Sequence, residues 1–435
     1  MEKYEQMKAS GVNWILDIPN TWGIRVLFQL ADQVKNKNKD LSEQNLLSLS
    51  YGKIKRKDIN NPEGLLPESF DGYNIIEADD IVLRLTDLQN DHTSLRVGQA
   101  KERGIITSAY TTLRPSEIVN PQYLYYVLHA YDLIKGFYGM GAGVRQGLNY
   151  DEVKTIKVPF PSIEEQNRIV AYLDDQVSQI DSIIEHAKRS IEEYKLWEKA
   201  TIAESVLGYD RAGTSKRSGL EWIDQIPVAW ETVRLKTLFS FGKGLPITKE
   251  NLTEEGTPVI SYGQIHAKFN PGTHIVEDLV RYVPETYQET NPDALVHKGD
   301  LLVADTSEDL DGCGNAVYVD RDMTLFAGYH TITLKSLTGS DNKYISYLCK
   351  TDAWRSQIRS RVSGVKLFSI SKKILNMVTV ILTPEEERKA IVSDLDQKCQ
   401  KIESMINEKE SLIPDLELYK RSLIYDTVTG KRKVV

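Results

Sequence analysis

The sequence predicts an α+β fold in which two pseudo-twofold-related α+β modules are separated by a pair of long antiparallel coiled-coil helices. Three observations predict it: a motif that occurs twice, two long heptad patterns, and short strand-and-turn patterns between them. With 435 residues the chain is long enough for two or three domains, each with its own core. The expected parts are a first module (1–160), a first helix (161–208), a linker (209–218), a second module (219–381), a second helix (382–430) and a basic tail (431–435).

The repeated motif opens each half of the chain. Gly11 to Trp22 and Gly219 to Trp230 share Gly, Trp, Ile, Ile, Pro and Trp at an offset of 208 residues. Later, Leu49-Ser50-Tyr51-Gly52 returns as Ile260-Ser261-Tyr262-Gly263. The residues between such anchors differ, which favours two modules that share a fold but contact different targets. The alternative is a duplication that serves stability alone.

Each long helix is predicted by a start signal followed by a heptad pattern. Ser162 to Glu165 and Thr383 to Glu386 both read as capping boxes, and Pro384 suits a first helical position. The apolar residues that follow are spaced alternately by three and four, as in a coiled-coil seam. The seam residues are Leu173, Val177, Ile180, Ile184, Ile191, Leu395, Ile402, Ile406, Ile413 and Leu416.

Neither helix can bury such a seam alone, so we expect the two helices to pack on each other. If the halves are related by a pseudo-twofold axis, the helices must run antiparallel. Pro414 is expected to kink or break the second helix. The alternative is a pair of unrelated amphipathic surface helices.

The charge of the chain is unevenly distributed. Its net charge is −8, but residues 164–207 carry ten acidic and five basic side chains, and residues 385–429 carry eleven and seven. These two helical segments therefore account for −9, and the remainder is +1. The overall acidity does not exclude nucleic-acid binding by the modules.

Basic, amide and aromatic side chains near the repeated Tyr-Gly anchors, in a second basic run that begins at Arg355, and at Arg84 and Arg145 are the candidate DNA contacts. Cations suit phosphates, whereas glutamine and arginine can pair with adenine and guanine. Each of these residues, taken singly, is otherwise read as an ordinary solvated surface side chain. The candidates are Tyr51, Lys53, Lys55, Arg56, Lys57, Arg84, Arg145, Tyr262, Gln264, His266, Lys268, Arg355, Arg359, Arg361 and Lys366.

Sequence signatures of catalysis and cofactor binding are absent from the chain. There is no Walker lysine, no zinc-protease motif, no Cys/His metal set and no motif of an amino-methyltransferase. The glycines from Gly139 to Gly147 follow a predicted helix rather than a strand, which argues against a phosphate loop. Three scattered cysteines and no membrane-length apolar run favour a cytoplasmic protein. We therefore expect a non-catalytic chain without a bound metal or cofactor.

Taken together, these features resemble the specificity subunit of type I restriction–modification systems. The motifs that carry the resemblance are the openings at Trp14 and Trp222, the run from Gly143 to Leu148, and Pro161 to Gln166, which is similar to the family's entry to its conserved helix. The second copy departs from that entry motif at Pro384 and Glu387. The resemblance covers the whole chain.

The resemblance implies that each module is a target-recognition domain for one half of a bipartite double-stranded DNA site. It implies that two modification (methyltransferase) subunits dock on the helices, bind S-adenosylmethionine and methylate adenine. Restriction motor-nuclease subunits, which use ATP and Mg, would complete the complex. The alternatives are a stand-alone DNA methyltransferase or nuclease, and a coiled-coil scaffold without a role on DNA.

Overall fold

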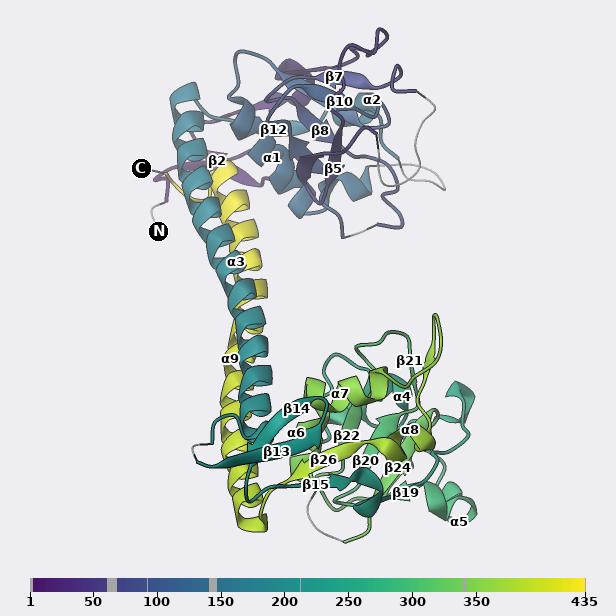
Figure 1. Ribbon diagram of the computed structural model, residues 1–435. Coiled ribbons are helices and arrows are strands. Elements are labelled where there is room, and N and C mark those ends of the chain that lie inside the picture. Colours follow the sequence, from purple (N-terminus) through teal and green to yellow (C-terminus); the bar gives the residue numbers. More distant parts are fainter. Residues whose placement is uncertain are drawn as a thin grey trace. The chain divides into compact units, whose positions relative to one another are not determined.

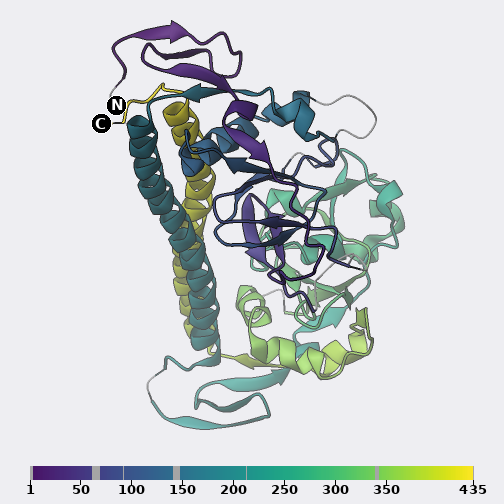
Figure 2. The same ribbon diagram turned by 90° about the horizontal axis from the view of Figure 1, so that it is seen from above.

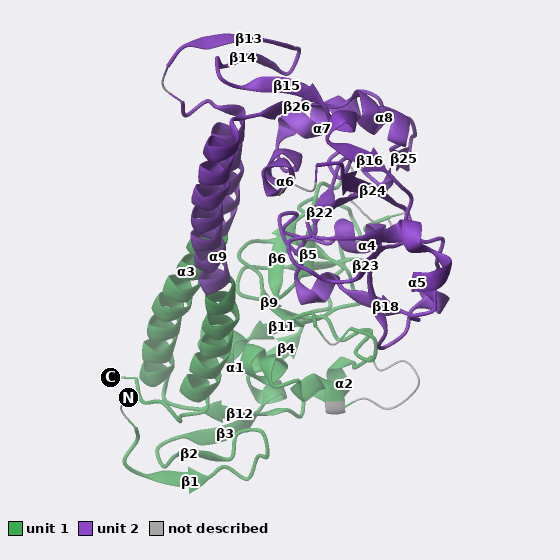
Figure 3. Cartoon of the chain, turned by 90° about the horizontal axis from the view of Figure 1, so that it is seen from below, with its two compact units in different colours: residues 1–188, 410–435 green, residues 189–409 purple. Residues whose placement is uncertain are grey.

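The repeat in the sequence is also a repeat in the fold. The computed structural model describes residues 3–60, 69–91, 93–140, 147–211, 213–338 and 342–434 (Figure 1). The chain divides into unit 1, which is residues 1–188 with 410–435, and unit 2, which is residues 189–409 (Figure 3). The long helices α3 (Ile163–Leu207) and α9 (Glu385–Val428) each contribute to both units.

Unit 1 is built on antiparallel strands. Its central sheet has the order β4 (Ala31–Gln33), β11 (Thr111–Pro115), β8 (Ile81–Leu83), β9 (Val97–Gln99). The remaining strands pair as β1 (Met7–Ala9) with β2 (Asp17–Pro19), β3 (Gly23–Val26) with β12 (Lys157–Phe160), β5 (Leu47–Ser50) with β6 (Lys53–Arg56), and β7 (Asn74–Ile76) with β10 (Gly104–Ile106). The shorter helices are α1 (Pro121–Leu133), α2 (Tyr150–Val153), η1 (Leu27–Gln29) and η2 (Gly136–Gly139).

Unit 2 repeats this strand order. Its central sheet runs β16 (Phe239–Phe241), β24 (Thr331–Ser336), β20 (Leu301–Ala304), β22 (Ala316–Tyr318). A second sheet runs β18 (Arg281–Val283), β17 (Thr257–Ile260), β23 (Leu325–Ala327), β19 (Leu295–Val296), with β17 and β23 parallel. The other pairs are β13 (Ser215–Leu220) with β14 (Ile223–Pro227), β15 (Glu231–Arg234) with β26 (Thr379–Leu382), and β21 (Thr306–Ser307) with β25 (Phe368–Ser369).

The helical parts of unit 2 besides α3 and α9 are short. They are α4 (Tyr262–Ile265), α5 (Tyr287–Thr290), α6 (Lys343–Cys349), α7 (Asp352–Arg359), α8 (Lys372–Met377), η3 (Leu235–Thr237), η4 (Lys249–Asn251), η5 (Glu277–Leu279) and η6 (Pro292–Ala294). Helices α6 and α7 are separate, because Thr351 caps α7 by accepting from the backbone of Trp354. The predicted pair of α+β modules is confirmed.

The opening motif of each half closes the end of a long helix. Gly208 and Gly430 have φ angles of +78° and +74°, the left-handed conformation that terminates helices. A Cβ atom on Gly208 would overlap Pro227, and one on Gly430 would overlap Pro19, so both sites require glycine. The fully buried rings of Trp22 and Trp230 also lie against these glycines. The motif that identified the repeat is thus a packing motif.

The long helices pack side by side, as predicted (Figures 1 and 2). In unit 1 the start of α3 shares a core with the end of α9, and Lys420 pairs with Asp181 at 2.5 Å. In unit 2 the end of α3 shares a core with the start of α9. The two helices are therefore antiparallel. Buried seam residues are Leu173, Ile180, Ile184, Ile191, Leu395 and Ile402, and half-buried ones are Val177, Ile406, Ile413 and Leu416.

Local structure differs from the sequence expectations at three places. The helix α9 does not break at Pro414, whose exposed position leaves the rest of the helix free to pack. The expected linker 209–218 ends inside strand β13. The hydroxyl of Thr383 donates to the carbonyl of Pro384 at 3.1 Å instead of capping α9, whereas Ser162 does accept from the backbone of Glu165 at 3.3 Å.

A buried histidine makes the stability of unit 1 depend on pH. Burial, with smaller effects from Lys420 and Arg421, lowers the pKa of His129 to about 4. Because the folded state holds this ring neutral, its contribution is complete above the unfolded pKa of about 6.5 and is lost as pH falls toward 4. Between pH 7.5 and 5 this loss amounts to about 2 kcal/mol of unfolding free energy.

Between pH 7.5 and pH 5, the free energy of unfolding of His129→Gln should fall by about 2 kcal/mol less than that of the wild type, as measured by urea denaturation. Burial also raises the pKa of Asp132 on the same helix to about 6, which acts in the opposite direction. That effect is common to both proteins and cancels in the comparison. Parallel pH profiles for the two proteins would contradict the prediction.

Candidate nucleic-acid interface

Loops next to the two sheets of unit 2 meet at one end of that unit. We define the loop end of unit 2 as residues 261–266, 305–315, 328–330 and 363–369. The backbone of Tyr262 donates to the carbonyl of Tyr329 at 3.0 Å, and that of Asp305 donates to the carbonyl of His330 at 3.0 Å. Strands β21 and β25 join the second and fourth segments. Four segments far apart in sequence therefore form one surface.

The loop end of unit 2 presents aromatic rings. The ring of Tyr262 packs edge-on to His330 at 5.5 Å, and His330 lies 4.0 Å from Tyr329. Tyr329 is 44% exposed. His266 serves the scaffold, because its Nε2 lies 2.8 Å from the carbonyl of Thr306 and its Nδ1 lies 3.0 Å from the amide of Asn315. The predicted contact His266 is therefore occupied within the protein.

Two of the predicted arginines anchor a loop instead of facing outward. Arg355 donates to the carbonyl of Asp311 at 2.5 Å, and burial lowers the pKa of its guanidinium. Arg359 donates to the carbonyl of Leu310 at 3.0 Å and to Asp352 at 2.8 Å. Both side chains thus hold the loop between β21 and β22. The residue pattern alone does not distinguish an arginine that holds a loop from an arginine that is exposed on the surface.

The other predicted contacts of unit 2 have different surroundings. The side-chain oxygen of Gln264 accepts from the backbone of Ser261 at 3.1 Å and so caps α4. Arg361 donates to the carbonyl of Gln357 at 2.6 Å. Lys268 and Lys366 are exposed, and Lys366 lies beside Val365, which is 93% exposed. These two lysines therefore keep the open placement that a DNA contact needs, whereas Tyr262 is half-buried against a core of unit 2.

Unit 1 has a corresponding loop end around the hairpin of β5 and β6. Tyr51 and Gly52 form its two-residue turn with φ angles of 48° and 75°, and Tyr51 is 74% exposed. Lys53 and Lys55 are exposed on one face of β6, since side chains two apart on a strand share a face. Lys57 is also exposed.

Arg56 differs from its neighbours because it forms a two-pronged ion pair with Glu102. This pair raises the pKa of the arginine and lowers that of the carboxyl. Arg84 is half-buried, and Arg145 lies outside the described residues. The basic cluster therefore consists of the exposed lysines Lys53, Lys55 and Lys57, and of Arg56, whose charge is balanced by Glu102.

A buried arginine holds the loop between β8 and β9 in unit 1. The side chain of Arg96 is fully buried and donates to the carbonyls of Thr86 and Asp87 at 2.9 and 3.3 Å. It also contacts Tyr138. A hydrophobic-pattern analysis gives no signal for such a residue, because a lone arginine in sequence reads as solvated.

The conserved-helix entry motif is structural as well. Gln166 is fully buried, donates to the carbonyl of Pro161 at 3.0 Å and accepts from the backbone of Asn120 at 2.9 Å. It thereby ties the start of α3 to α1. In unit 2, Glu387 accepts from the indole of Trp230 at 3.0 Å. In the second copy, Glu387 thus replaces the glutamine of the entry motif and ties the start of α9 to Trp230.

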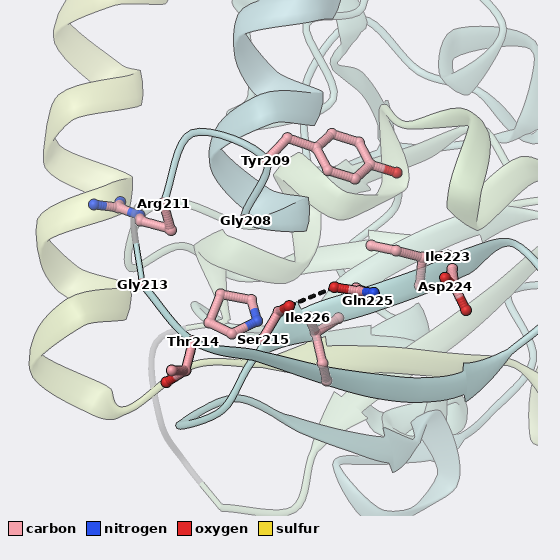
Figure 4. A pocket seen from close by; sticks show the side chains of 11 residues that line it. Gly208, Tyr209, Arg211, Gly213, Thr214, Ser215, Ile223, Asp224, Gln225 and Ile226 are labelled. Carbon is pink, nitrogen blue, oxygen red and sulfur yellow. Dashed lines mark hydrogen bonds between the residues drawn. The ribbon is translucent and has the colours of Figure 1, made fainter.

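The described residues contain no group of three or more His, Cys, Asp and Glu side chains placed to hold a metal ion. A cavity of about 400 Å³ lies between the end of α3 and the β13–β14 hairpin, lined by residues including Tyr209, Arg211, Ser215 and Gln225 (Figure 4). It lies in the segment that connects the repeats. Among the helices in the described residues, none has the length and apolar character of a membrane-spanning segment.

The paired helices and two matching modules agree with one family. The model of the type I restriction modification DNA specificity domain matches the chain twice, over residues 21–193 and 227–412. The chain belongs to this family. Each match takes in one module and much of one long helix. The protein is therefore a DNA specificity subunit of a type I restriction–modification complex and is not itself the catalytic subunit, as the sequence predicted.

Two relatives described as specificity subunits, one of them putative, are similar in sequence to most of this chain. The specificity subunit of the type I restriction enzyme MjaVIII of Methanocaldococcus jannaschii is 22% identical over 77% of this chain and 75% of its own length. The putative type I restriction enzyme MjaX specificity subunit of the same organism is 24% identical over 99% of this chain and 98% of its own.

Solved structures show the same fold. A chain from a study of complex assembly and conformational transition of the type I R–M system matches with a TM-score of 0.69 and 15% identity, covering 95% of this chain and 99% of that one. The HsdS subunit from Thermoanaerobacter tengcongensis matches with a TM-score of 0.53 and 15% identity, covering 95% and 98%. The predicted fold class and family are confirmed.

Proposed function

We propose that unit 1 and unit 2 each read one half of a bipartite double-stranded DNA site through their loop ends. The observation that carries this proposal is that one scaffold, with the same strand order, presents different side chains in its two copies. A specificity subunit with two such readers suits a target with two half-sites. The recognition domains are residues 1–160 and 219–381, and the spacer helices are residues 161–208 and 382–430.

The side chains proposed to meet DNA lie at or next to the two loop ends. In unit 1 they are the exposed Tyr51, Lys53, Lys55 and Lys57, and in unit 2 they are the exposed Lys268 and Lys366 with the half-buried Tyr262. Lysines supply phosphate contacts, and exposed aromatic rings can pack against sugars or bases. Arg355, Arg359 and His266 act instead on the shape of the loop that carries these side chains.

The long helices are proposed to dock two modification subunits. Outside the seam, α3 exposes the apolar side chains of Ile183 (47%), Leu196 (65%) and Trp197 (52%). The pairing of the two helices leaves these side chains uncovered. Ile169 and Ile202 of the same helix are buried within the protein's own cores and are not available to a partner. The proposed complex binds S-adenosylmethionine on the modification subunits, and ATP and Mg on restriction motor-nuclease subunits, in the cytoplasm where its DNA lies.

The proposal is tested by expressing the chain with its modification subunits in a host without DNA methylation and sequencing the modified bases. The expected result is methylated adenine in an interrupted motif, with two defined segments separated by a fixed number of unspecified base pairs. A continuous motif, or methylation without sequence preference, would contradict two separate readers. A complex without this chain serves as the control.

The lysines of β6 give a prediction about salt dependence. Changing Lys53 and Lys55 to glutamine is expected to weaken binding of the assembled complex to all DNA sequences. The slope of log affinity against log salt should fall by about one unit per lost phosphate contact. Arg56→Gln should have a smaller effect, because Glu102 already balances that charge.

The matched control is the change of Lys188 and Lys195 to glutamine, since these exposed lysines of α3 pair with Glu185 and Glu192. Binding by that variant should follow the wild-type salt curve. If the Lys53/Lys55 variant also overlays the wild-type curve, the hairpin does not contact phosphates.

A further inference from the structure

His330 occupies a constrained turn at the loop end of unit 2. Its φ angle is +54°, a left-handed conformation that residues other than glycine seldom adopt. The conformation is held from outside, because the backbone of Asp305 donates to the carbonyl of His330 at 3.0 Å. The turn joins β23 to β24, so the imidazole stands at the rim of the central sheet. Its position is defined by the scaffold.

Hydrogen bonding also defines the orientation of the imidazole. Its Nδ1 lies 2.8 Å from Oδ1 of Asp305, which accepts a second bond from the hydroxyl of Thr306 at 2.6 Å. A carboxylate only accepts, so the proton of a neutral ring lies on Nδ1 and Nε2 is left with its lone pair. Within the described ranges Nε2 has no hydrogen-bond partner, and the side chain is 37% exposed.

The surroundings suit a hydrogen-bond donor better than a phosphate. The loop that supplies Asp305 also carries Glu308 and Asp309, so a phosphate would meet negative charges beside His330, whereas Asp311 further along is paired with Arg359 at 3.3 Å. The nearest rings are those of Tyr262 and Tyr329, which are uncharged partners at 5.5 and 4.0 Å. A fixed acceptor between aromatic rings matches the edge of a base that carries an amino group. In the major groove those groups are N6 of adenine and N4 of cytosine.

The same place in unit 1 has different chemistry. Ile81 of β8 pairs with β9 and β11 as Leu301 of β20 pairs with β22 and β24, which sets the structural equivalence. Four residues later, unit 2 has Asp305 where unit 1 has Leu85, whose side chain is buried. The carboxylate that orients His330 is therefore particular to unit 2. A difference of this kind on a shared scaffold is what two readers of different sequences require.

We infer that His330 is a specificity-determining residue of unit 2, which accepts a hydrogen bond at Nε2 from the exocyclic amino group of an adenine or a cytosine, with Asp305 as its positioning residue. The inference rests on the proposed function, because it assigns one base contact to the half-site that unit 2 reads. It goes beyond that proposal by naming the residue, the accepting atom and the class of base.

The test is methylation sequencing of the assembled complex with His330→Gly, since glycine adopts the left-handed conformation without strain. We expect one base position of one half-site to become degenerate, with discrimination there falling about tenfold to a hundredfold. The wild-type base at that position, adenine or cytosine (or its complement), identifies the contact. Asp305→Asn should relax the same position. His297→Gly, an exposed histidine before the opposite end of β20, is the control and should leave the motif unchanged.

Each outcome decides the inference separately from the proposed function. An interrupted motif that is unchanged in His330→Gly overturns the contact while both readers stand. Degeneracy at different positions in the His330 and Asp305 variants overturns the pairing. Loss of all methylation in a folded and assembled His330→Gly complex, with folding checked by thermal denaturation, points to a general role and also overturns it. A wild-type complex without an interrupted motif overturns the proposed function itself.

Discussion

Replacing Ile402 by aspartate is expected to lower the free energy of unfolding by about 3–5 kcal/mol, because the change buries an unpaired charge. Ile402 is 1% exposed in the part of α9 that belongs to unit 2, and it belongs to the seam that faces α3. Ile180→Asp should act similarly on unit 1, where Ile180 is 5% exposed. Urea denaturation followed by circular dichroism measures both effects.

The matched control is Ile183→Asp, also on α3, where the side chain is 47% exposed. Its charge remains solvated, so the change in unfolding free energy should stay within about 0.5 kcal/mol. Equal destabilisation by the Ile402 and Ile183 variants would show that the heptad seam does not hold the helices together.

The second large effect concerns assembly with the modification subunits. Leu196 and Trp197 are adjacent, 65% and 52% exposed, and lie on α3 within unit 2. Large apolar side chains, tryptophan above all, carry much of the energy at protein interfaces. Changing both to glutamate is expected to weaken binding of the modification subunit at least a hundredfold, while the thermal stability of the free chain stays unchanged.

Co-purification and size-exclusion chromatography with the modification subunit measure this effect. Lys199→Glu, also exposed on α3, is the control for added negative charge and should still assemble. Normal assembly of the double variant would place the docking surface elsewhere. A loss of stability in the free chain would instead mean that these side chains support the fold.

The long helices and the repeat were predictable because both produce residue patterns that recur at regular spacings in the sequence. Spacings of three and four run through Leu173, Ile180 and Ile184, and their burial follows from that period. Trp22 and Trp230 recur because the helix ends they cover recur. Pro414 does not break α9, since the rule about isolated helices does not include the packing that stabilises a helix with one missing hydrogen bond.

The roles of individual polar residues were much less predictable. Arg56, Arg355 and Gln264 looked like exposed contacts in sequence, yet each has a partner inside its own unit. Their partners are Glu102, Asp311 and Ser261, and two of these lie more than forty residues away. Asp305 and His330 meet only because β20 and β24 are neighbours in the sheet. Charge and residue type alone carry no information about such pairings.

The central claim is that each unit reads its half-site independently. The backbone of Leu27 donates to the carbonyl of Ile156 at 2.9 Å, so the chain enters and leaves the first module at neighbouring points. Residues 27–156 can therefore be exchanged for the matching segment of a relative, with β3, β12 and both long helices kept. Sequencing of methylated bases in the assembled complex should then show one half of the interrupted motif replaced and the other half and the spacer length unchanged. A change in both halves, or in neither, would contradict the account.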